Sequence, residues 1–329
     1  MNKNITKAIK YIIFLAIGIG IFWWIYKDLK WEELKVSLQD VNWFWLLMSV
    51  VFIVISHASR ALRWAMLIKP LGHNVRFKNI YSSIFILYMT NLIIPRAGEI
   101  ARCTVVSKYE EVPLTKLIGT VFTERLIDVL ALLLIAVAVL LLNIETFQDF
   151  LSSHEEISRN IDKLFTSKNI LIGLGILIAI MLFFVFFRPS KENKFFKKIS
   201  TIFLNLKDGV KSITQMQNKW LFVGHTIFIY AMYVLSFYSV FLAFPFMSEL
   251  SFNSCLFVFL MGGLAMLAPV QGGIGPWHFM VIESLILFGI SETDGKVFAL
   301  VAHTSTNLIN LLFGAIIVII MPFLNRSKI

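Results

Sequence analysis

The sequence predicts an all-α polytopic membrane protein, with about six transmembrane helices and two re-entrant helical hairpins arranged as an inverted repeat. Of its 329 residues, 58% are hydrophobic and 15% are charged, whereas about 25% of the residues in an ordinary soluble domain are charged. Uncharged runs at 41–59, 169–187, 220–248 and 297–325 have about the length that a membrane-crossing helix needs. Two further apolar segments stop at a proline. Together these observations exclude a water-soluble globular protein.

The expected spans follow from the apolar runs in chain order. The first run, 11–26, follows Lys3, Lys7 and Lys10 and ends without a small-residue cleavage site, so we interpret it as a retained membrane helix and not as a signal peptide. The predicted transmembrane helices are 11–26, 43–68, 116–142, 170–187, 220–246 and 297–324.

Two apolar segments are interrupted in a way that predicts hairpins. The segment 79–94 stops at Pro95 and is followed by only about ten helical residues before Lys108. A helix of that length rises roughly 15 Å, which is too short to cross a bilayer. We therefore predict a re-entrant hairpin at 79–108 and a second at 252–290, broken around Pro269. Irregular backbone at this depth must face protein or a water-filled cavity.

The whole chain, 1–329, is predicted to be a single integral membrane domain with two halves, 1–142 and 170–329. Three crossings in each half would turn the second half upside down, a pattern found in secondary transporters. The segment 188–219 is rich in Lys and Arg, and the positive-inside rule places it and both termini in the cytoplasm, with the protein in the inner cell membrane. The alternative is that proline and glycine only kink ordinary transmembrane helices.

Arginines gather in the first half of the sequence. Arg60 and Arg63 share one face of a predicted helix, Arg96 and Arg102 lie in the first hairpin, and Arg125 lies in the next span. Each guanidinium can bind phosphate through two hydrogen bonds, so five of them in one region favour an anion site. The alternative for Arg60 and Arg63 is anchoring at the inner interface.

Carboxylates are predicted in the same region. Glu124 and Asp128 are four residues apart on one helical face, where like charges repel unless cations lie between them, and Glu99 lies in the hairpin. Structural ion pairs with Arg96 and Arg125 are one interpretation, because charges within a membrane are normally paired. The other is that these pairs line a polar cavity and are exchanged when a charged headgroup enters.

The second break, 268–278, contains Gly272, Gly273 and Gly275 and places Pro276 where a helix can begin. It has no lysine after it and no strand before it, so it is not a nucleotide-binding loop. The polar residues between His303 and Asn310 are interpreted as hydrogen-bonding contacts between helices, as are His57, His225 and His278. No metal site, cofactor, catalytic signature or nucleic-acid partner is predicted. Cys103 and Cys255 are expected to be inert packing residues.

Four patterns resemble the lysylphosphatidylglycerol synthase transmembrane (flippase-like) family. They are Arg60-x-x-Arg63-Trp64; Asn91 followed by Pro95-Arg96-x-Gly98-Glu99-x-x-Arg102; Glu124-Arg125-x-x-Asp128; and Pro269-x-x-Gly272-Gly273-x-Gly275. The resemblance covers nearly the whole chain. It implies a path for a lipid headgroup, with these candidate residues: Arg60, Arg63, Asn91, Arg96, Glu99, Arg102, Glu124, Arg125, Asp128, Gln271, Gly272, Gly273, Gly275 and His278.

In bifunctional members of that family, a cytoplasmic domain makes an aminoacylated lipid and the membrane part is implicated in moving it between leaflets. The present sequence ends at Ile329 without such a domain, so we expect no aminoacyl transfer. Relatives often carry a glutamate after the Gly-Gly-x-Gly break, where this chain has His278. A glycolipid or another anionic phospholipid is therefore as admissible as an aminoacylated one.

Three functions are consistent with the sequence. The first is an inner-membrane lipid translocase or lipid-binding transporter without covalent chemistry. The second is a membrane scaffold that recruits a cytoplasmic lipid-modifying enzyme or glycosyltransferase through the basic loop 188–219. The third is a membrane-embedded transferase with Glu124 or Asp128 as its base.

Overall fold

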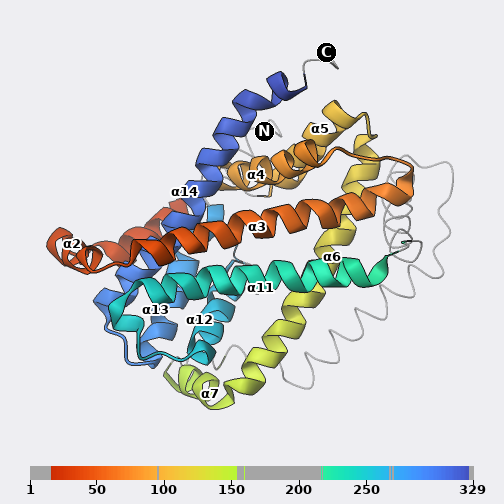
Figure 1. The fold of residues 1–329 in the computed structure, drawn as a ribbon. Helices are drawn as coiled ribbons and strands as arrows, with labels where there is room; N and C mark the ends of the chain where they lie inside the picture. The colour runs from red at the N-terminus through yellow and green to blue at the C-terminus, as the bar shows by residue number, and fades with distance from the viewer. Residues whose placement is uncertain are drawn as a thin grey trace, which may run out of the picture.

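The computed structural model describes residues 16–94, 96–153, 218–266 and 270–325, together with Arg159, Met216 and Ala268. Every regular element within these residues is a helix, and Figure 1 shows their arrangement. After a first helix at Ala16–Tyr26, the elements are α2 (Trp31–Gln39), α3 (Trp43–Ile68), η1 (Lys69–Leu71), α4 (Phe77–Ile93), α5 (Gly98–Glu110), α6 (Leu114–Leu142), α7 (Ile144–Ser153), α11 (Lys219–Ala243), η2 (Pro245–Met247), α12 (Phe252–Ala265), η3 (Gln271–Gly273), α13 (Pro276–Leu287) and α14 (Glu292–Leu324).

Four of the described helices are long and apolar enough to cross a membrane: α3 with η1, α6, α11 and α14. They confirm the predicted spans 43–68, 116–142, 220–246 and 297–324. The predicted span 11–26 is helical in its described part, Ala16–Tyr26. The predicted span 170–187 and nearly all of the basic loop 188–219 lie outside the described residues, so the count of six stays a prediction.

The last span begins earlier than its apolar run indicates. Ser291 caps α14 by accepting a hydrogen bond from the Asp294 backbone N–H (3.1 Å), and Glu292 and Asp294 lie in the first turn. A serine cap and acidic residues both stabilise a helix N-terminus. The helix therefore starts at Glu292, five residues before the Val297 that the apolar run gives.

The residues of both predicted hairpins form pairs of contacting helices, α4–α5 and α12–α13; that these pairs are re-entrant stays a prediction. The four helices have 17, 13, 14 and 12 residues, each shorter than the roughly 20 residues of a typical crossing. At the first break, Asn91 Oδ1 accepts a hydrogen bond from the Gly98 N–H (2.8 Å). The prolines of both breaks, Pro95 and Pro269, lie outside the described residues. Pro276 is the first residue of α13, as predicted.

The long helices α3 and α11 pack side by side in opposite directions (Figure 1). Near one end of the pair, the Asn42 N–H donates to the Ala243 carbonyl (2.9 Å), and towards the other end Ser59 Oγ contacts His225 Nδ1 (2.8 Å). Because α4 follows the end of α3 and α12 follows the end of α11, the two hairpins start at opposite ends of this pair.

Each hairpin packs on the last helix of the other half, α4 on α14 and α12 on α6. A pair of asparagines marks each of the two contacts. Asn79 near the start of α4 exchanges two amide hydrogen bonds with Asn325, the C-cap of α14 (2.9 Å each). Asn253 near the start of α12 does the same with Asn143, the C-cap of α6 (2.8 and 3.1 Å). The two halves therefore repeat one pattern of contacts.

The turns of the two hairpins meet inside the molecule. The short helix η3 contacts α4, and a Cβ atom added to Gly272, whose φ is +56°, would lie 2.9 Å from Leu92 Cδ2. Glycine adopts this backbone conformation without strain, and a larger residue would also have to displace the Leu92 side chain. The helix Ala16–Tyr26 covers the turn from another side, through Ile21 against Gly275. This meeting point borders the cavity described next.

Candidate functional site

A cavity of about 340 Å³ lies between the two halves. Helices α3, α4 and α6 of the first half and α11, α12, α13 and α14 of the second half contribute to its wall. Its volume is at the lower end of the range for small-molecule sites. The cavity is therefore large enough for a small ligand or for one end of a larger one.

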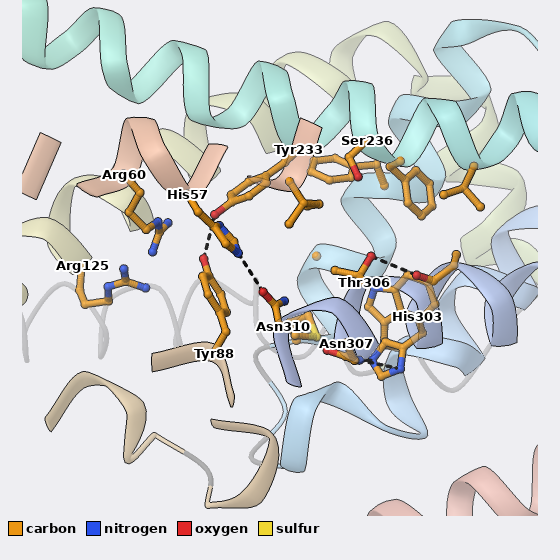
Figure 2. Close-up of a pocket in the computed structure, with 18 residues that line it drawn as sticks. His57, Arg60, Tyr88, Arg125, Tyr233, Ser236, His303, Thr306, Asn307 and Asn310 are labelled. Atoms are coloured by element: carbon orange, nitrogen blue, oxygen red, sulfur yellow. Dashed lines mark hydrogen bonds between the residues drawn. The ribbon is translucent and has the colours of Figure 1, made fainter. Parts of the chain in front are cut away.

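The two ends of the cavity differ chemically (Figure 2). Arg60 and Arg125 lie at one end, and His303, Thr306 and Asn307 lie at the other. Between the ends, two hydrogen-bonded pairs face each other. They are His57 Nε2 with Asn310 Oδ1 (2.9 Å) and the hydroxyls of Tyr88 and Tyr233 (2.9 Å).

At the arginine end, α6 provides two acidic side chains that hold arginines from three helices. Glu124 is fully buried and contacts Arg102 (2.8 Å), Arg125 (3.0 Å), Arg63 (3.4 Å) and Arg60 (3.6 Å). Asp128, one turn further along α6, also contacts Arg60, Arg63 and Arg125. Four arginines around two carboxylates leave a formal excess of two positive charges.

The four arginines have different surroundings. Arg63 and Arg102 are completely buried and do not line the cavity. The Arg102 guanidinium lies 4.4 Å from the ring centre of Trp64, and that of Arg63 lies 5.7 Å from the ring centre of Phe222, so both gain cation–π contacts. Arg60 and Arg125 line the cavity instead. Arg60 and Arg125 are therefore the two members of the positively charged cluster that a ligand in the cavity would contact.

At the opposite end, a hydrogen-bonded chain fixes the imidazole of His303. Its Nε2 lies 2.7 Å from the Gly272 carbonyl oxygen, and its Nδ1 lies 3.1 Å from Asn307 Nδ2. A carbonyl can only accept, so Nε2 carries the proton and Nδ1 accepts from the amide, which is the pattern of a neutral imidazole. The Trp277 ring lies 5.0 Å from the His303 ring, centre to centre. This end is polar, aromatic and formally uncharged.

Comparisons with known proteins show the family of the chain. The family described as the lysylphosphatidylglycerol synthase TM region matches residues 11–314. The chain belongs to this family. It is also similar to a UPF0104 membrane protein of Methanocaldococcus jannaschii, with 32% identity over 132 residues, or 39% of this chain and 38% of that protein. The match thus spans less than half of the length of either protein. No solved structure matches the chain.

In this member of the lysylphosphatidylglycerol synthase TM family, six of the candidate residues form one group, as predicted. Arg60 and Arg125 face the cavity, and four others lie behind them: Arg63, Arg102, Glu124 and Asp128. The two interpretations of the sequence, structural ion pairs and a polar cavity, therefore both describe parts of the same cluster.

Among the described residues, Arg96 makes no ion pair with this cluster, unlike the other four arginines of the prediction. Arg96 is exposed and has a φ of +62° in the turn between α4 and α5, whereas Arg102 lies inside α5, which packs on α6. The remaining candidates of the first break are also separate from the cavity. Asn91 binds the Gly98 N–H, and Glu99, in the first turn of α5, contacts none of the four clustered arginines within the described residues.

The candidates of the second break form the wall behind the cavity and not its lining. Gly272, Gly273 and Gly275 have positive φ angles of 56°, 76° and 93°, which fits glycine, and Gln271 is buried beside them. His278 Nδ1 accepts from the Gly275 N–H at 3.4 Å. Their contribution to the site is indirect, through the Gly272 carbonyl that holds His303.

Several residues that line the cavity were not predicted as site residues, or were interpreted only as contacts between helices. His57, Tyr88, Tyr233, Ser236 and Trp277 all line the cavity. The residues 303, 306, 307 and 310, interpreted as contacts between helices, have the i, i+3, i+4, i+7 spacing of one helical face and line it together. Tyr233 and Ser236 share a face of α11 in the same way. A search for polar residues at helical spacing within the apolar runs would have found these faces.

Within the described residues, no three His, Cys, Asp or Glu side chains are grouped for metal binding. Cys103 and Cys255 are buried free thiols, consistent with packing residues. The absence of a cofactor stays a prediction.

Proposed function

We propose that the protein is a translocase or transporter of the inner cell membrane for a lipid with an anionic headgroup. The observation that carries this proposal is the pair Arg60 and Arg125 at one end of a cavity between the two halves. An arginine within a membrane costs roughly 2.5–3.5 kcal/mol on insertion scales, and two carboxylates cannot neutralise four of them. A phosphate entering the cavity would complete the charge balance through charge-assisted hydrogen bonds.

The proposed transport path uses the repeat. Hairpins that start at opposite ends of the α3–α11 pair, and that make the same contacts with the other half, support an inverted repeat with re-entrant hairpins. In transporters of that design, the substrate site lies where the two repeats meet, and rocking of one repeat against the other opens it alternately to each side. The cavity has this position, between α3 and α4 of one half and α11 and α14 of the other.

This orientation gives the first testable prediction. Lys78, at the start of α4, and Glu249, just before α12, are both exposed and begin the two hairpins. In intact cells, Lys78→Cys should react with a membrane-impermeant maleimide only after the membrane is opened, and Glu249→Cys should react without opening. The native thiols are buried and serve as the unlabelled background. Labelling of both positions from one side would contradict the inverted arrangement.

The second prediction tests transport itself. Purified protein in vesicles should accelerate the movement of a fluorescent anionic phospholipid between leaflets, and Arg125→Gln should slow it by roughly tenfold or more, because a lost hydrogen bond to a charged group costs about 1.5–3 kcal/mol. The matched control is Lys116→Gln, which removes a positive charge from an exposed position on the same helix. Absence of movement for anionic, neutral and glycosylated lipids with the unaltered protein would refute the proposal.

Two other functions stay hypotheses. Recruitment of a cytoplasmic enzyme depends on the segment 188–219, nearly all of which lies outside the described residues. The second is the membrane-embedded transferase with Glu124 or Asp128 as its base. Our proposal is instead that the protein performs no covalent step. The test is to incubate the purified protein with phosphatidylglycerol and aminoacyl-tRNA and to analyse the lipids. Formation of an aminoacylated lipid would contradict it.

A further inference from the structure

We propose that the headgroup bound here combines a phosphate with an uncharged group that carries several hydroxyls. The phosphate lies at Arg60 and Arg125, and the hydroxyl-bearing group lies between Asn310, Asn307 and Trp277. This inference rests on the proposed function and specifies its substrate class. It also excludes cationic aminoacyl headgroups.

The arginine end is built for an anion. Arg60 is only 4% exposed, and its Nε has no hydrogen-bond acceptor among the described residues, while its Nη1 has only the 3.6 Å ion-pair contact with Glu124. Nε of Arg125 also has no acceptor there, and neither do Nε of Arg63 and Nε of Arg102 behind the cavity, so the whole cluster has more donors than its two carboxylates satisfy. Buried N–H groups without acceptors are costly. Both guanidiniums contact the same carboxylate oxygens, Glu124 Oε1 and Asp128 Oδ2, so they are adjacent and can share one phosphate.

The tyrosine pair extends this end with a neutral donor. When one of the hydroxyls of Tyr88 and Tyr233 donates to the other, the accepting hydroxyl keeps its own hydrogen for another acceptor. The Arg60 guanidinium carbon also lies over the ring of Tyr88, 6.0 Å from the ring centre, which is a cation–π contact. A phosphate at Arg60 therefore lies beside a hydroxyl donor.

The middle and the opposite end of the cavity offer both donors and acceptors. Asn310 uses its amide oxygen for His57 and leaves its NH₂ group without a partner among the described residues, whereas Asn307 uses its NH₂ group for His303 and leaves its oxygen. A hydroxyl both donates and accepts, so it matches two such amides. The Trp277 indole, close to the His303 ring, adds a flat apolar wall of the kind that lines small-molecule sites.

A cationic headgroup does not match these surroundings. An ammonium only donates hydrogen bonds, and it needs carboxylates or several free carbonyls. Asp and Glu are absent from the residues described as lining the cavity, and Glu124 and Asp128 are occupied by arginines. The formal excess of two positive charges would also repel it.

The test is competition for the purified protein in nanodiscs, with a fluorescent phosphatidylinositol as the probe. Phosphatidylinositol has a phosphate and a ring of hydroxyls, phosphatidic acid has the phosphate alone, and lysyl-phosphatidylglycerol has a cationic headgroup. We expect phosphatidylinositol to compete at least tenfold better than either of the other two. Equal competition by phosphatidic acid, or stronger competition by the lysylated lipid, would overturn the inference.

Variants separate the two ends of the cavity. Asn307→Leu should bring phosphatidylinositol down to the affinity of phosphatidic acid and leave phosphatidic acid unchanged, which also shows that the variant is folded. Arg125→Gln should weaken both lipids by tenfold or more, and Lys116→Gln should weaken neither. An Asn307→Leu protein that keeps its preference for phosphatidylinositol would contradict the assignment of the hydroxyl end.

Soluble inositol 1-phosphate distinguishes a lipid from a free phosphate ester. Competition only by the lipid supports a lipid substrate, whereas equal competition by the soluble ester contradicts it. The result is also independent of transport. If lipids move without preference, the substrate inference fails and the proposed function stands. If phosphatidylinositol binds selectively but does not move, the proposed function fails and the headgroup assignment stands.

Discussion

Glu124→Gln is expected to cause one of the largest losses of stability that a single substitution can produce in this protein. Glu124 is completely buried and lies within 3.6 Å of four arginines. Glutamine keeps the shape of the side chain but removes the negative charge, so one carboxylate would remain for four guanidiniums. Breaking a buried ion pair in this way costs about 3–5 kcal/mol.

The measurement is the thermal unfolding midpoint of the purified protein in mild detergent, read together with the fraction that elutes as a single folded species. Glu145→Gln is the matched control, since Glu145 is exposed at the start of α7 and surface substitutions change stability little. If Glu124→Gln unfolds at the same temperature as the control, Glu124 does not hold the arginines together, and the charge balance described for the cavity is incorrect.

The cluster also shows why some of the fold could be predicted from the sequence and some could not. The spacing of Arg60 and Arg63, and of Glu124 and Asp128, is set by the helical period, so the sequence indicates which side chains share a face. Which faces meet depends on helix packing. The sequence therefore grouped Arg102 and Arg96 together, although only Arg102 reaches Glu124.

In the second half of the chain, too, the features set by local sequence could be predicted, and those set by helix packing could not. The glycines and Pro276 mark the break correctly because their backbone preferences are local. The cavity lining instead includes Trp277, in the first turn of α13 at the end of the break, and His303 and its neighbours on α14. Local signals predicted the turn, but they gave no information about the helix that packs behind it.

The repeat was indicated by the order of apolar runs and is now supported by contacts that no local pattern contains. The asparagine pairs Asn79–Asn325 and Asn143–Asn253 are 246 and 110 residues apart in the chain. Each ties the start of a hairpin to the end of a long helix from the other half. The position of each hairpin therefore depends on a contact with the opposite half.

Gly98→Ala is expected to disrupt the first hairpin, and with it the position of Arg102. A Cβ atom at Gly98 would lie 2.1 Å from the Leu87 carbonyl oxygen and 2.8 Å from the Asn91 side chain. The obstacle at Leu87 is backbone, so it cannot rotate away, and α5 would have to separate from α4. Overpacking in a tight interior costs typically 1–3 kcal/mol, and we expect a loss of about 3 kcal/mol because a main-chain atom is the obstacle.

The matched control is Gly224→Ala on α11. A Cβ atom there would meet nothing within 4 Å, and alanine within a helix is more favourable than glycine by roughly 0.5–1 kcal/mol. The two alanine variants should therefore shift the thermal midpoint in opposite directions, down for Gly98 and slightly up for Gly224. Gly98→Ala should also slow lipid movement more than its lower stability explains. The reason is that Arg102, on the displaced α5, would lose its 2.8 Å contact with Glu124. The Glu124 carboxylate would then rearrange around Arg60 and Arg125. A Gly98→Ala protein as stable and as active as Gly224→Ala would show that the close approach of α4 and α5 does not position the arginine cluster.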